Sequence, residues 1–245
     1  MIVRGGPQFI DERVRMRDQQ IRPADVQHAA LDDPHPAFAE RHRATRAAAL
    51  DTPRGRLLDA LVECAATDGY AGLTAAAVAQ RAGATLESFL EYFPDVQHCF
   101  IEAVRTGTDI MATRLAEELA QLPPGAGFHA RVESIVTTFC LQVAIEPAFA
   151  RVVLAESFQA GPQAVHLRDM AVDRFAELYR YFYAEARASD PTLPALPDER
   201  FMLIPDAVGE RTRRVILAEG AHRVPELATE FIDFACTVLE LPNRP

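Results

Sequence analysis

Side chains able to contact nucleic acid gather in one short stretch of the sequence, between positions 74 and 93. Hydroxyl groups donate hydrogen bonds to phosphate oxygens, and a glutamate can accept one from cytosine N4 in the major groove. The stretch carries such groups, with one leucine among them, at Thr74, Thr85, Leu86, Glu87, Ser88 and Tyr92. These residue types are compatible with contacts to double-stranded DNA.

A basic segment precedes this stretch. The net charge of the chain is −10, but residues 1–56 carry ten arginines against eight acidic residues, and residues 57–245 carry fifteen against twenty-seven. Within 41–56 five arginines stand against one aspartate. Arginine arms lie along phosphates or enter the minor groove, so we predict DNA contacts from Arg41, Arg43 and Arg46. A solvated charged tail is the alternative interpretation.

The sequence gives no support for catalysis or for a metal centre. Seven histidines and thirty-five carboxylates form no H-E-x-x-H motif, no nucleophile elbow and no phosphate-binding loop. Each of the four cysteines lies inside an apolar helical pattern, far from the others, at Cys64, Cys99, Cys140 and Cys236. We therefore expect buried reduced thiols, no catalytic residue, no cofactor and no metal.

Three short helices are expected to position the candidate DNA contacts. Apolar residues at helical spacing predict a first helix from about Leu57, and Asp68-Gly69 ends it because glycine readily adopts the left-handed conformation. Thr74 can cap a second helix over 75–81, and after Gly83 a third helix follows. Two short helices joined by a glycine turn are typical of a helix-turn-helix unit, which places a helix in the major groove.

This segment resembles the tetracycline-repressor (TetR) family of bacterial transcriptional regulators. The resemblance rests on D-G-Y at 68–70, on the block L-T-x-x-x-V-A-x-R-A-G-A at 73–84, and on a third helix that ends in Y-F before a proline and an aspartate. The phrase VVLAESFQAGP at 152–162 is similar to a segment of the family's ligand domain. The resemblance implies an all-α fold, with a three-helix N-terminal DNA-binding domain and a C-terminal helical ligand-binding and dimerisation domain.

The resemblance also implies a function. Thr74, Thr85, Ser88 and Tyr92 match positions where the family contacts phosphates or bases, so with Leu86 and Glu87 they are the predicted DNA contacts of this segment. A homodimer of this family would set two recognition helices into successive major grooves of operator DNA, about 34–36 Å apart. The function we expect is a transcriptional regulator, in particular a repressor that responds to a ligand. The ligand must bind the two conformations differently if it is to change DNA affinity.

The third helix departs from the family pattern. Glu87 stands where many members have glycine, Leu90 where tyrosine is common, and Glu91 where arginine or a polar residue is frequent. Two outward glutamates repel DNA, which carries a charge about every 1.7 Å of its axis. The alternative function is therefore a TetR-like dimer that binds a ligand or a protein and has lost sequence-specific DNA binding.

Composition and the positions of helix-breaking glycine and proline residues divide the chain into three parts. We expect a largely irregular tail over 1–50 with a basic arm at 41–56, a helix-turn-helix domain over 51–104, and a ligand-binding and dimerisation domain over 105–245. A helix between His35 and Leu50 is compatible with the spacing of alanines. Further helices are predicted over about 96–122, 128–143, 148–158, 163–188, 201–218 and 225–241, with a loop of three prolines over 189–199.

The helices between 128 and 188 are expected to enclose the pocket. Its candidate lining residues are Phe139, Cys140, Phe149, His166, Met170, Phe175 and Tyr179. Such a lining suits a small hydrophobic or aromatic ligand with one or two polar groups, although any one of these residue types is more often plain core than a ligand contact.

The last two predicted helices are apolar on more than one side, which favours contact with a second subunit. In the family, helices in this position form the dimer interface. The candidate interface residues are Phe201, Val208, Val215, Leu227, Phe231, Phe234 and Val238. Completion of a monomeric core is the alternative.

No run of about 18 apolar residues occurs, and the N-terminus lacks the apolar core of a signal peptide. We expect a soluble cytoplasmic protein with no membrane partner.

Overall fold

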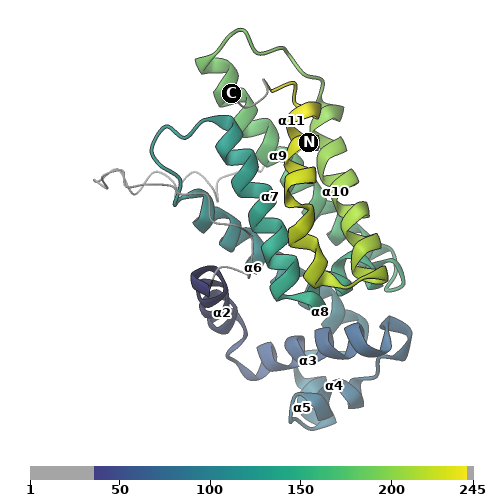
Figure 1. Ribbon diagram of the computed structural model, residues 1–245. Coiled ribbons are helices and arrows are strands. Elements are labelled where there is room, and N and C mark those ends of the chain that lie inside the picture. Colours follow the sequence, from purple (N-terminus) through teal and green to yellow (C-terminus); the bar gives the residue numbers. More distant parts are fainter. Residues whose placement is uncertain (1–35, 242–245) are drawn as a thin grey trace, which may run out of the picture.

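The computed structural model describes residues 36–241, and all regular structure within that range is helical (Figure 1). The predicted all-α class is confirmed. The expectations for residues 1–35 lie outside the described residues. Among residues 36–241 no single helix combines the length and the apolarity of a membrane span. One pair, Phe128–Ile145 with Pro147–Phe158, meets those criteria only when both are taken together, and it is bent by 107°.

The predicted helix-turn-helix domain occupies the lower end of the molecule in Figure 1. It comprises α3 (Pro53–Asp68), a short 3-10 helix (Tyr70–Gly72), α4 (Ala75–Arg81) and α5 (Leu86–Tyr92). These bounds agree with the sequence pattern, because the capping threonines and the turn glycines fix the helix ends locally.

The core of this domain continues into the second domain. Leu61, Val78 and Phe89 are fully buried beside residues of α8 and α9 such as Val152 and Ala164. Each large apolar side chain buried in this way contributes about 1.5–3 kcal/mol. The two parts share one hydrophobic core. Helices α3 and α8 can therefore move relative to each other only if the packing between them is broken.

A buried carboxylate adds a polar link at the same junction. Glu156, from the phrase 152–162, is 3% exposed, and its Oε2 accepts a hydrogen bond from the Tyr70 backbone N–H at 3.0 Å. The turn after α3 is therefore held by a residue of the second domain.

Six α-helices follow the helix-turn-helix along the described part of the chain. Helix α6 (Val96–Leu119) connects the two parts, and α7 (Phe128–Ile145), α8 (Pro147–Leu154) and α9 (Pro162–Ser189) follow it. Helices α10 (Asp198–Ala218) and α11 (Ala228–Val238) run beside α7 and α9 in an upright bundle (Figure 1). A second hydrophobic core fills this bundle.

Two details of this region differ from the sequence pattern. The last helix was expected from Pro225, but a 3-10 helix (Ala221–Leu227) comes first and α11 begins at Ala228. Likewise α8 stops at Leu154, and a 3-10 helix covers Glu156–Phe158. Pro205 lies inside α10, and the helix continues through it.

Helix α2 (Pro36–Leu50) is the helix that the spacing of alanines allowed between His35 and Leu50, at the end of the segment expected to be largely irregular. It lies against α3 and α6 and buries Phe38 and His42. The Arg114 guanidinium, itself 0% exposed, lies 5.3 Å from the centre of the Phe38 ring. Packing through these contacts stabilises α2. Its sequence is rich in alanine and arginine and does not show which face is buried.

Candidate nucleic-acid interface and ligand groove

Two threonines fix the helices that would meet DNA. Thr74 Oγ1 accepts a hydrogen bond from the Ala77 N–H at 3.1 Å, and Thr85 Oγ1 accepts one from the Ser88 N–H at 3.2 Å. N-caps of this kind satisfy amides that have no partner within the helix and contribute about 1 kcal/mol each. Gly83, with φ of 67°, makes the left-handed turn between them. The helix-turn-helix predicted from the sequence is therefore confirmed.

Helix α5 presents its predicted contact residues Leu86, Glu87 and Tyr92 to solvent, whereas Ser88 is half-buried. Leu86, Leu90 and Tyr92 are 43%, 51% and 42% exposed, and Glu87 and Glu91 are exposed beside them. The outward face of α5 thus combines apolar and acidic groups and carries no basic side chain. Contact of this face with DNA stays a prediction.

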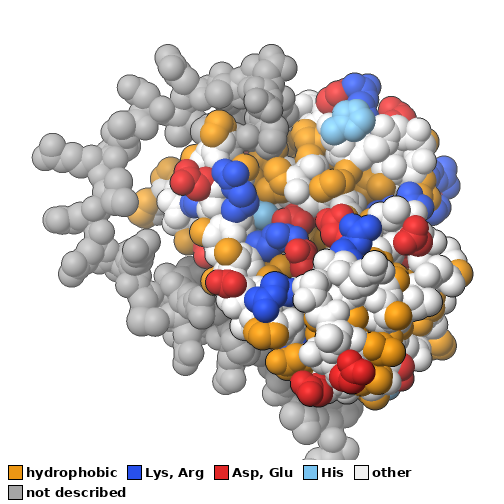
Figure 2. Space-filling model, turned by 90° about the horizontal axis from the view of Figure 1, so that it is seen from below, with side chains coloured by type: hydrophobic (Ala, Val, Ile, Leu, Met, Phe, Trp, Pro, Cys, Tyr) orange, Lys and Arg blue, Asp and Glu red, His pale blue; other side chains and the backbone are white. Residues whose placement is uncertain are grey.

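Basic groups lie around α5 rather than on it. Arg54 of α3 pairs with Glu102 at 2.8 Å, and its guanidinium lies over the Phe93 ring. Arg56 and Arg81 are exposed and make no ion pair within residues 36–241. Seen from this end, arginines and acidic side chains lie side by side across the middle of the face (Figure 2). Sequence reasoning did not select Arg56 and Arg81 as DNA contacts, although their positions before and inside the recognised motif would have justified it.

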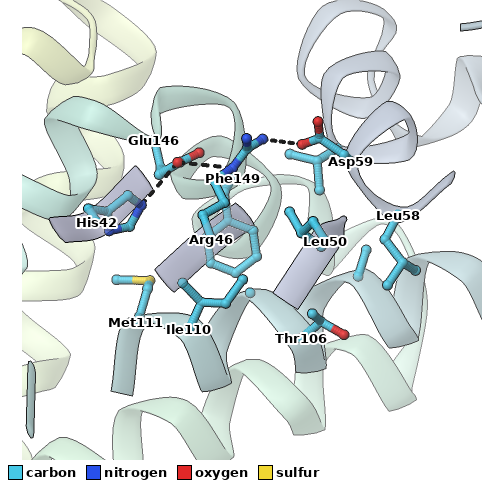
Figure 3. A pocket seen from close by; sticks show the side chains of 13 residues that line it. His42, Arg46, Leu50, Leu58, Asp59, Thr106, Ile110, Met111, Glu146 and Phe149 are labelled. Carbon is cyan, nitrogen blue, oxygen red and sulfur yellow. Dashed lines mark hydrogen bonds and ion pairs between the residues drawn. The ribbon is translucent and has the colours of Figure 1, made fainter. Parts of the chain in front are cut away.

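The expected basic arm is part of a helix, and two of its three arginines are paired. Arg41 Nη2 lies 2.8 Å from Glu118 of α6. Arg46 pairs with Asp59 of α3 and with Glu146, the residue between α7 and α8 (Figure 3). Arg43 alone is exposed without an ion pair in the described part of the chain. An extended arm would have left Arg41 and Arg46 free for phosphates. In the folded chain, carboxylates on α3, on α6 and just before α8 attract their guanidinium groups instead.

Four of the predicted pocket residues are core residues of the bundle. Phe139 and Phe175 meet edge to face with ring centroids 5.8 Å apart, and they pack against the hydrophobic core of the bundle. Cys140 and Tyr179 are buried within it. Burial raises the pKa of the Cys140 thiol to about 12, so this thiol stays protonated at neutral pH. These side chains fill space rather than line a cavity.

The remaining three predicted residues line two separate hollows. Phe149 lies in a cleft beside α2, whereas His166 and Met170 line a groove between α6 and α9. In this structure the seven predicted residues therefore do not line one common cavity. His166 and Phe175 are about two and a half turns apart on α9, so they lie on opposite faces of that helix.

The groove between α6 and α9 has an amphipathic lining and a volume of about 760 Å³, which includes solvent at its mouth. Arg105 and Asp109 of α6 face Leu167, Met170 and Arg174 of α9. Arg174 Nη1 lies 3.2 Å from Asp109 Oδ1. Apolar contact surface next to two guanidinium groups suits a molecule with a hydrophobic body and an acidic group.

The structure also revises the predicted dimer face. Four of the seven candidates are already buried in the core of their own protomer, between 2% and 8% exposed: Phe201, Val208, Val215 and Phe231. Leu227 and Val238 are half-buried, and Phe234 is 37% exposed. Leu203 and Leu217, which sequence reasoning did not select for the interface, are 53% and 45% exposed on the outer side of α10. The two leucines are 14 residues apart, four turns of a helix, which places them on one face.

The cysteines are free thiols, three of them buried and Cys236 half-buried. Residues 36–241 contain no group of three or more histidine, cysteine or acidic side chains arranged to hold a metal ion.

Residues 57–103 match the sequence profile described as bacterial regulatory proteins, tetR family. This range contains both capping threonines, the glycine turn and the whole of α5. None of the curated proteins compared with the chain matches it.

Solved structures share the fold of the chain. The transcriptional regulator FadR from Bacillus subtilis, solved in complex with stearoyl-CoA, is 14% identical with a TM-score of 0.65, and the match covers 77% of this chain and 98% of that one. The fatty acid degradation regulator FadR from Bacillus halodurans is 13% identical, with a TM-score of 0.64 and coverage of 76% and 94%. A tetR-family regulatory protein from Rhodococcus RHA1 is 18% identical, with a TM-score of 0.61 and coverage of 77% and 97%.

The profile match covers the helix-turn-helix, and the fold agrees with that of these regulators over most of their length. About a quarter of this chain has no counterpart in them. The helix-turn-helix segment of the chain, residues 57–103, thus matches the tetR family of bacterial regulatory proteins, and the chain shares the fold of solved regulators described as members of that family.

Proposed function

We propose that this protein is a ligand-responsive transcriptional regulator that binds operator DNA as a homodimer through α4 and α5. The observation that carries the proposal is the capped helix pair within the matched segment, with five exposed side chains on the outer face of α5. Thr74 and Thr85 hold the helix ends in place, and the side chains of Leu86, Glu87 and Tyr92 are presented outward for contact with bases and backbone.

Exposed cations on α2, α3 and α4 support this function despite the two glutamates. Arg43, Arg56 and Arg81 are exposed and unpaired within residues 36–241, so their charges are available to phosphates. Each phosphate neutralised by such a group releases counterions, which makes binding depend on salt. We propose that these arginines supply affinity and that the groups on α5 supply discrimination between sequences.

A direct test is fluorescence anisotropy with a duplex taken from immediately upstream of the protein's own coding sequence. A scrambled duplex of the same length serves as the control, and both are titrated at low and near-physiological salt. We expect the native duplex to bind more tightly by a factor of about 10³ or more. Equal affinity for both duplexes at both salt concentrations would favour the alternative, a dimer without sequence-specific DNA binding.

We propose that the groove between α6 and α9 receives the effector, a small hydrophobic molecule with an acidic group. The stearoyl-CoA bound by the Bacillus subtilis neighbour joins an acyl chain to a polyanionic head group. The groove offers Leu167 and Met170 beside Arg105 and Arg174, a lining with the same two chemical characters. Decanoyl-CoA, decanoate and decanol are suitable probes because they share an alkyl chain and differ in charge.

Each probe is titrated into the protein–operator complex, and release is followed by anisotropy. Decanoyl-CoA should release DNA at the lowest concentration and decanol at the highest. Replacing both Arg105 and Arg174 with alanine should raise the required concentration of the charged probes by about tenfold or more. Arg180→Ala is the matched control, since Arg180 is an arginine of α9 that pairs with Asp198 outside the groove. Equal release by all three probes would remove the groove from the proposal.

A further inference from the structure

The outer face of α5 lacks the side chains that usually recognise purine bases. Its exposed residues include Leu86, Glu87, Leu90 and Glu91, and the helix contains no arginine, lysine, asparagine or glutamine. These four residue types make the principal contacts with guanine and adenine in the major groove. Seen from this end of the molecule, hydrophobic side chains lie beside acidic ones (Figure 2). The composition of α5 therefore restricts the bases that it can read.

Helical spacing arranges these exposed side chains in two adjacent stripes. Leu86 and Leu90 are four residues apart, about 6 Å along the helix axis, and form an apolar stripe. Glu87 and Glu91 form the acidic stripe beside it. The two leucines are 43% and 51% exposed, whereas Phe89 is fully buried in the core of the helix-turn-helix. The packing of Phe89 therefore fixes the rotation of α5 and keeps both stripes turned outward.

The polar side chains near these stripes are engaged or lie elsewhere. Ser88 is half-buried, and its Oγ accepts a hydrogen bond from Thr85 Oγ1 at 3.4 Å. Tyr92 occupies the last position of α5. Gln80 and Arg81 are exposed on α4, the helix that crosses the DNA backbone in this motif. Base contacts along the first turn of α5 therefore fall to its leucines and to its first glutamate.

The four bases present different groups to such a face. Thymine exposes a C5 methyl group in addition to an acceptor, and cytosine exposes an N4 amino group that donates a hydrogen bond. Guanine exposes two acceptors, and adenine exposes an acceptor beside its donor. Leucine gains from contact with the methyl group, whereas a carboxylate gains from the amino group and is repelled by acceptors. Pyrimidine edges therefore match both stripes of α5, and guanine matches neither.

We propose that α5 reads pyrimidines: Leu86 and Leu90 contact thymine methyl groups, and Glu87 accepts a hydrogen bond from cytosine N4. This inference rests on the proposed function and names the kind of operator that the protein binds. The two leucines are about 6 Å apart along the helix, and successive bases of one strand are about 3.4 Å apart. The contacted bases therefore lie within about three consecutive base pairs.

The charges around α5 favour a duplex over a protein partner on this face. A basic protein would suit an apolar and acidic helix, but the exposed cations of the neighbouring helices would repel it. Arg56 of α3 and Arg81 of α4 are exposed and make no ion pair within residues 36–241. A duplex is attracted by these cations through its phosphates and meets the two stripes of α5 at its base edges.

The operator for the test is obtained by selecting duplexes from a random library with the full chain. Deoxyuridine then replaces each thymine of one half-site in turn, which removes the C5 methyl group and preserves base pairing. Fluorescence anisotropy measures the affinity of each duplex. We expect two positions, about two base steps apart or closer, where uracil weakens binding by about fourfold, the factor that corresponds to burial of one methyl group. Uracil elsewhere in the half-site should leave the affinity unchanged.

Two variants assign these positions to the leucines. Leu86→Ala should bind thymine and uracil equally at one position and Leu90→Ala at the other, because alanine lacks the outer carbon atoms of leucine. Both leucines are exposed and alanine favours helix, so each variant should keep the fold, which circular dichroism verifies. Tyr181→Ala is the control, because Tyr181 is 46% exposed on α9, outside the helix-turn-helix, and this variant should keep both uracil effects.

A third variant tests the carboxylate. Glu87→Gln should shift the preference at one position from cytosine toward adenine by about tenfold, because an amide pairs with adenine N6 and N7. An unchanged preference would overturn the assignment of Glu87 to cytosine.

The outcomes separate this inference from the proposed function. Sequence-specific binding without a uracil-sensitive position, or uracil sensitivity that survives both leucine variants, would overturn the inference and leave the proposed function intact. A selection that enriches no sequence would overturn both.

Discussion

At the scale of single residues, the acidic character of α5 is the feature that most affects function. Glu87 and Glu91 are exposed one turn apart on the helix that would enter the major groove. A carboxylate in that position either accepts a hydrogen bond from cytosine N4 or only repels phosphates. The two roles make different predictions.

We expect Glu87→Ala to change which duplexes are preferred, because one base contact is worth about 1–3 kcal/mol of discrimination. Anisotropy against operator variants with each base pair substituted in turn would measure this. Glu91→Ala, one turn further along the same face, is the comparison for a general charge effect. A uniform rise in affinity for all sequences by Glu87→Ala would show that Glu87 only repels DNA.

The arginines of α2 permit a second prediction at this scale. Arg43 is exposed and unpaired within residues 36–241, whereas Arg41 is held by Glu118. Arg43→Ala should reduce the slope of log affinity against log salt by about 1. Arg41→Ala should leave that slope unchanged. Equal slopes for wild type and Arg43→Ala would take α2 out of the DNA interface.

Residue types predicted some roles well and others poorly. Thr74 and Thr85 were identifiable because an N-cap depends only on neighbours in the sequence. The partners of Arg41 and Arg46 were not, because Glu118 and Glu146 are about 75 and 100 positions away and only the fold brings them together. Sequence reasoning could count charges but could not assign which of them are neutralised.

At the scale of elements, the start of α6 gives a prediction that depends on pH. The Asp95 side chain caps this helix by accepting a hydrogen bond from the His98 backbone N–H at 2.8 Å. That hydrogen bond, with one from the His98 ring, lowers the pKa of Asp95 below its ordinary value. A carboxyl group whose pKa is lowered on folding stabilises the folded state above its unfolded pKa of about 3.9, and this stabilisation is lost as pH falls through the folded pKa.

Asp95→Ala should therefore reduce the free energy of unfolding by about 1 kcal/mol at pH 7, and the difference from wild type should shrink at pH 3 and below. Urea denaturation followed by circular dichroism at both pH values measures this. Asp95→Asn keeps a capping oxygen without a titrating group and should differ from wild type less than Asp95→Ala does at pH 7. A cost for Asp95→Ala that is the same at every pH would rule out the carboxylate as the cap.

Periodicity predicted most of the helices, but it did not determine what each face meets. Along α9, His166 and Phe175 have similar amphipathic surroundings in the sequence, yet one faces a solvent-filled groove and the other a packed ring. The same holds for α10, where Phe201 and Leu203 are both large and apolar and only the first is buried. The rotation of a helix that is apolar on more than one side is set by its neighbours in space.

At the scale of the whole molecule, the position of the helix-turn-helix constrains the proposed dimer. If both copies present α5 to one duplex, the two-fold axis runs along the long direction of the protomer, parallel to the bundle in Figure 1. The outer face of α10, with Leu203 and Leu217 near its two ends, is then available to the second copy along its whole length. Exposed leucines spaced along one helix face are typical of such an interface.

We expect Leu203→Asp to convert the dimer to a folded monomer, because the leucine is 53% exposed within its own protomer and its replacement disturbs no core. Phe231→Asp should instead unfold the chain, since Phe231 is 3% exposed and a buried carboxylate has no partner there. Sedimentation velocity and circular dichroism separate the two results. Leu90→Asp, at a leucine of similar exposure (51%) on α5, is the control and should remain dimeric.

The monomer also tests how the dimer reads DNA. With only one recognition helix, Leu203→Asp should bind a palindromic operator and its isolated half-site with nearly equal affinity, and its salt slope should be about half that of wild type. Wild type should prefer the full operator strongly, because its second helix binds without a further loss of translational freedom. If Leu203→Asp stays dimeric and keeps that preference, the interface lies on another face, and the half-buried Leu227 and Val238 with the exposed Phe234 become the next positions to test.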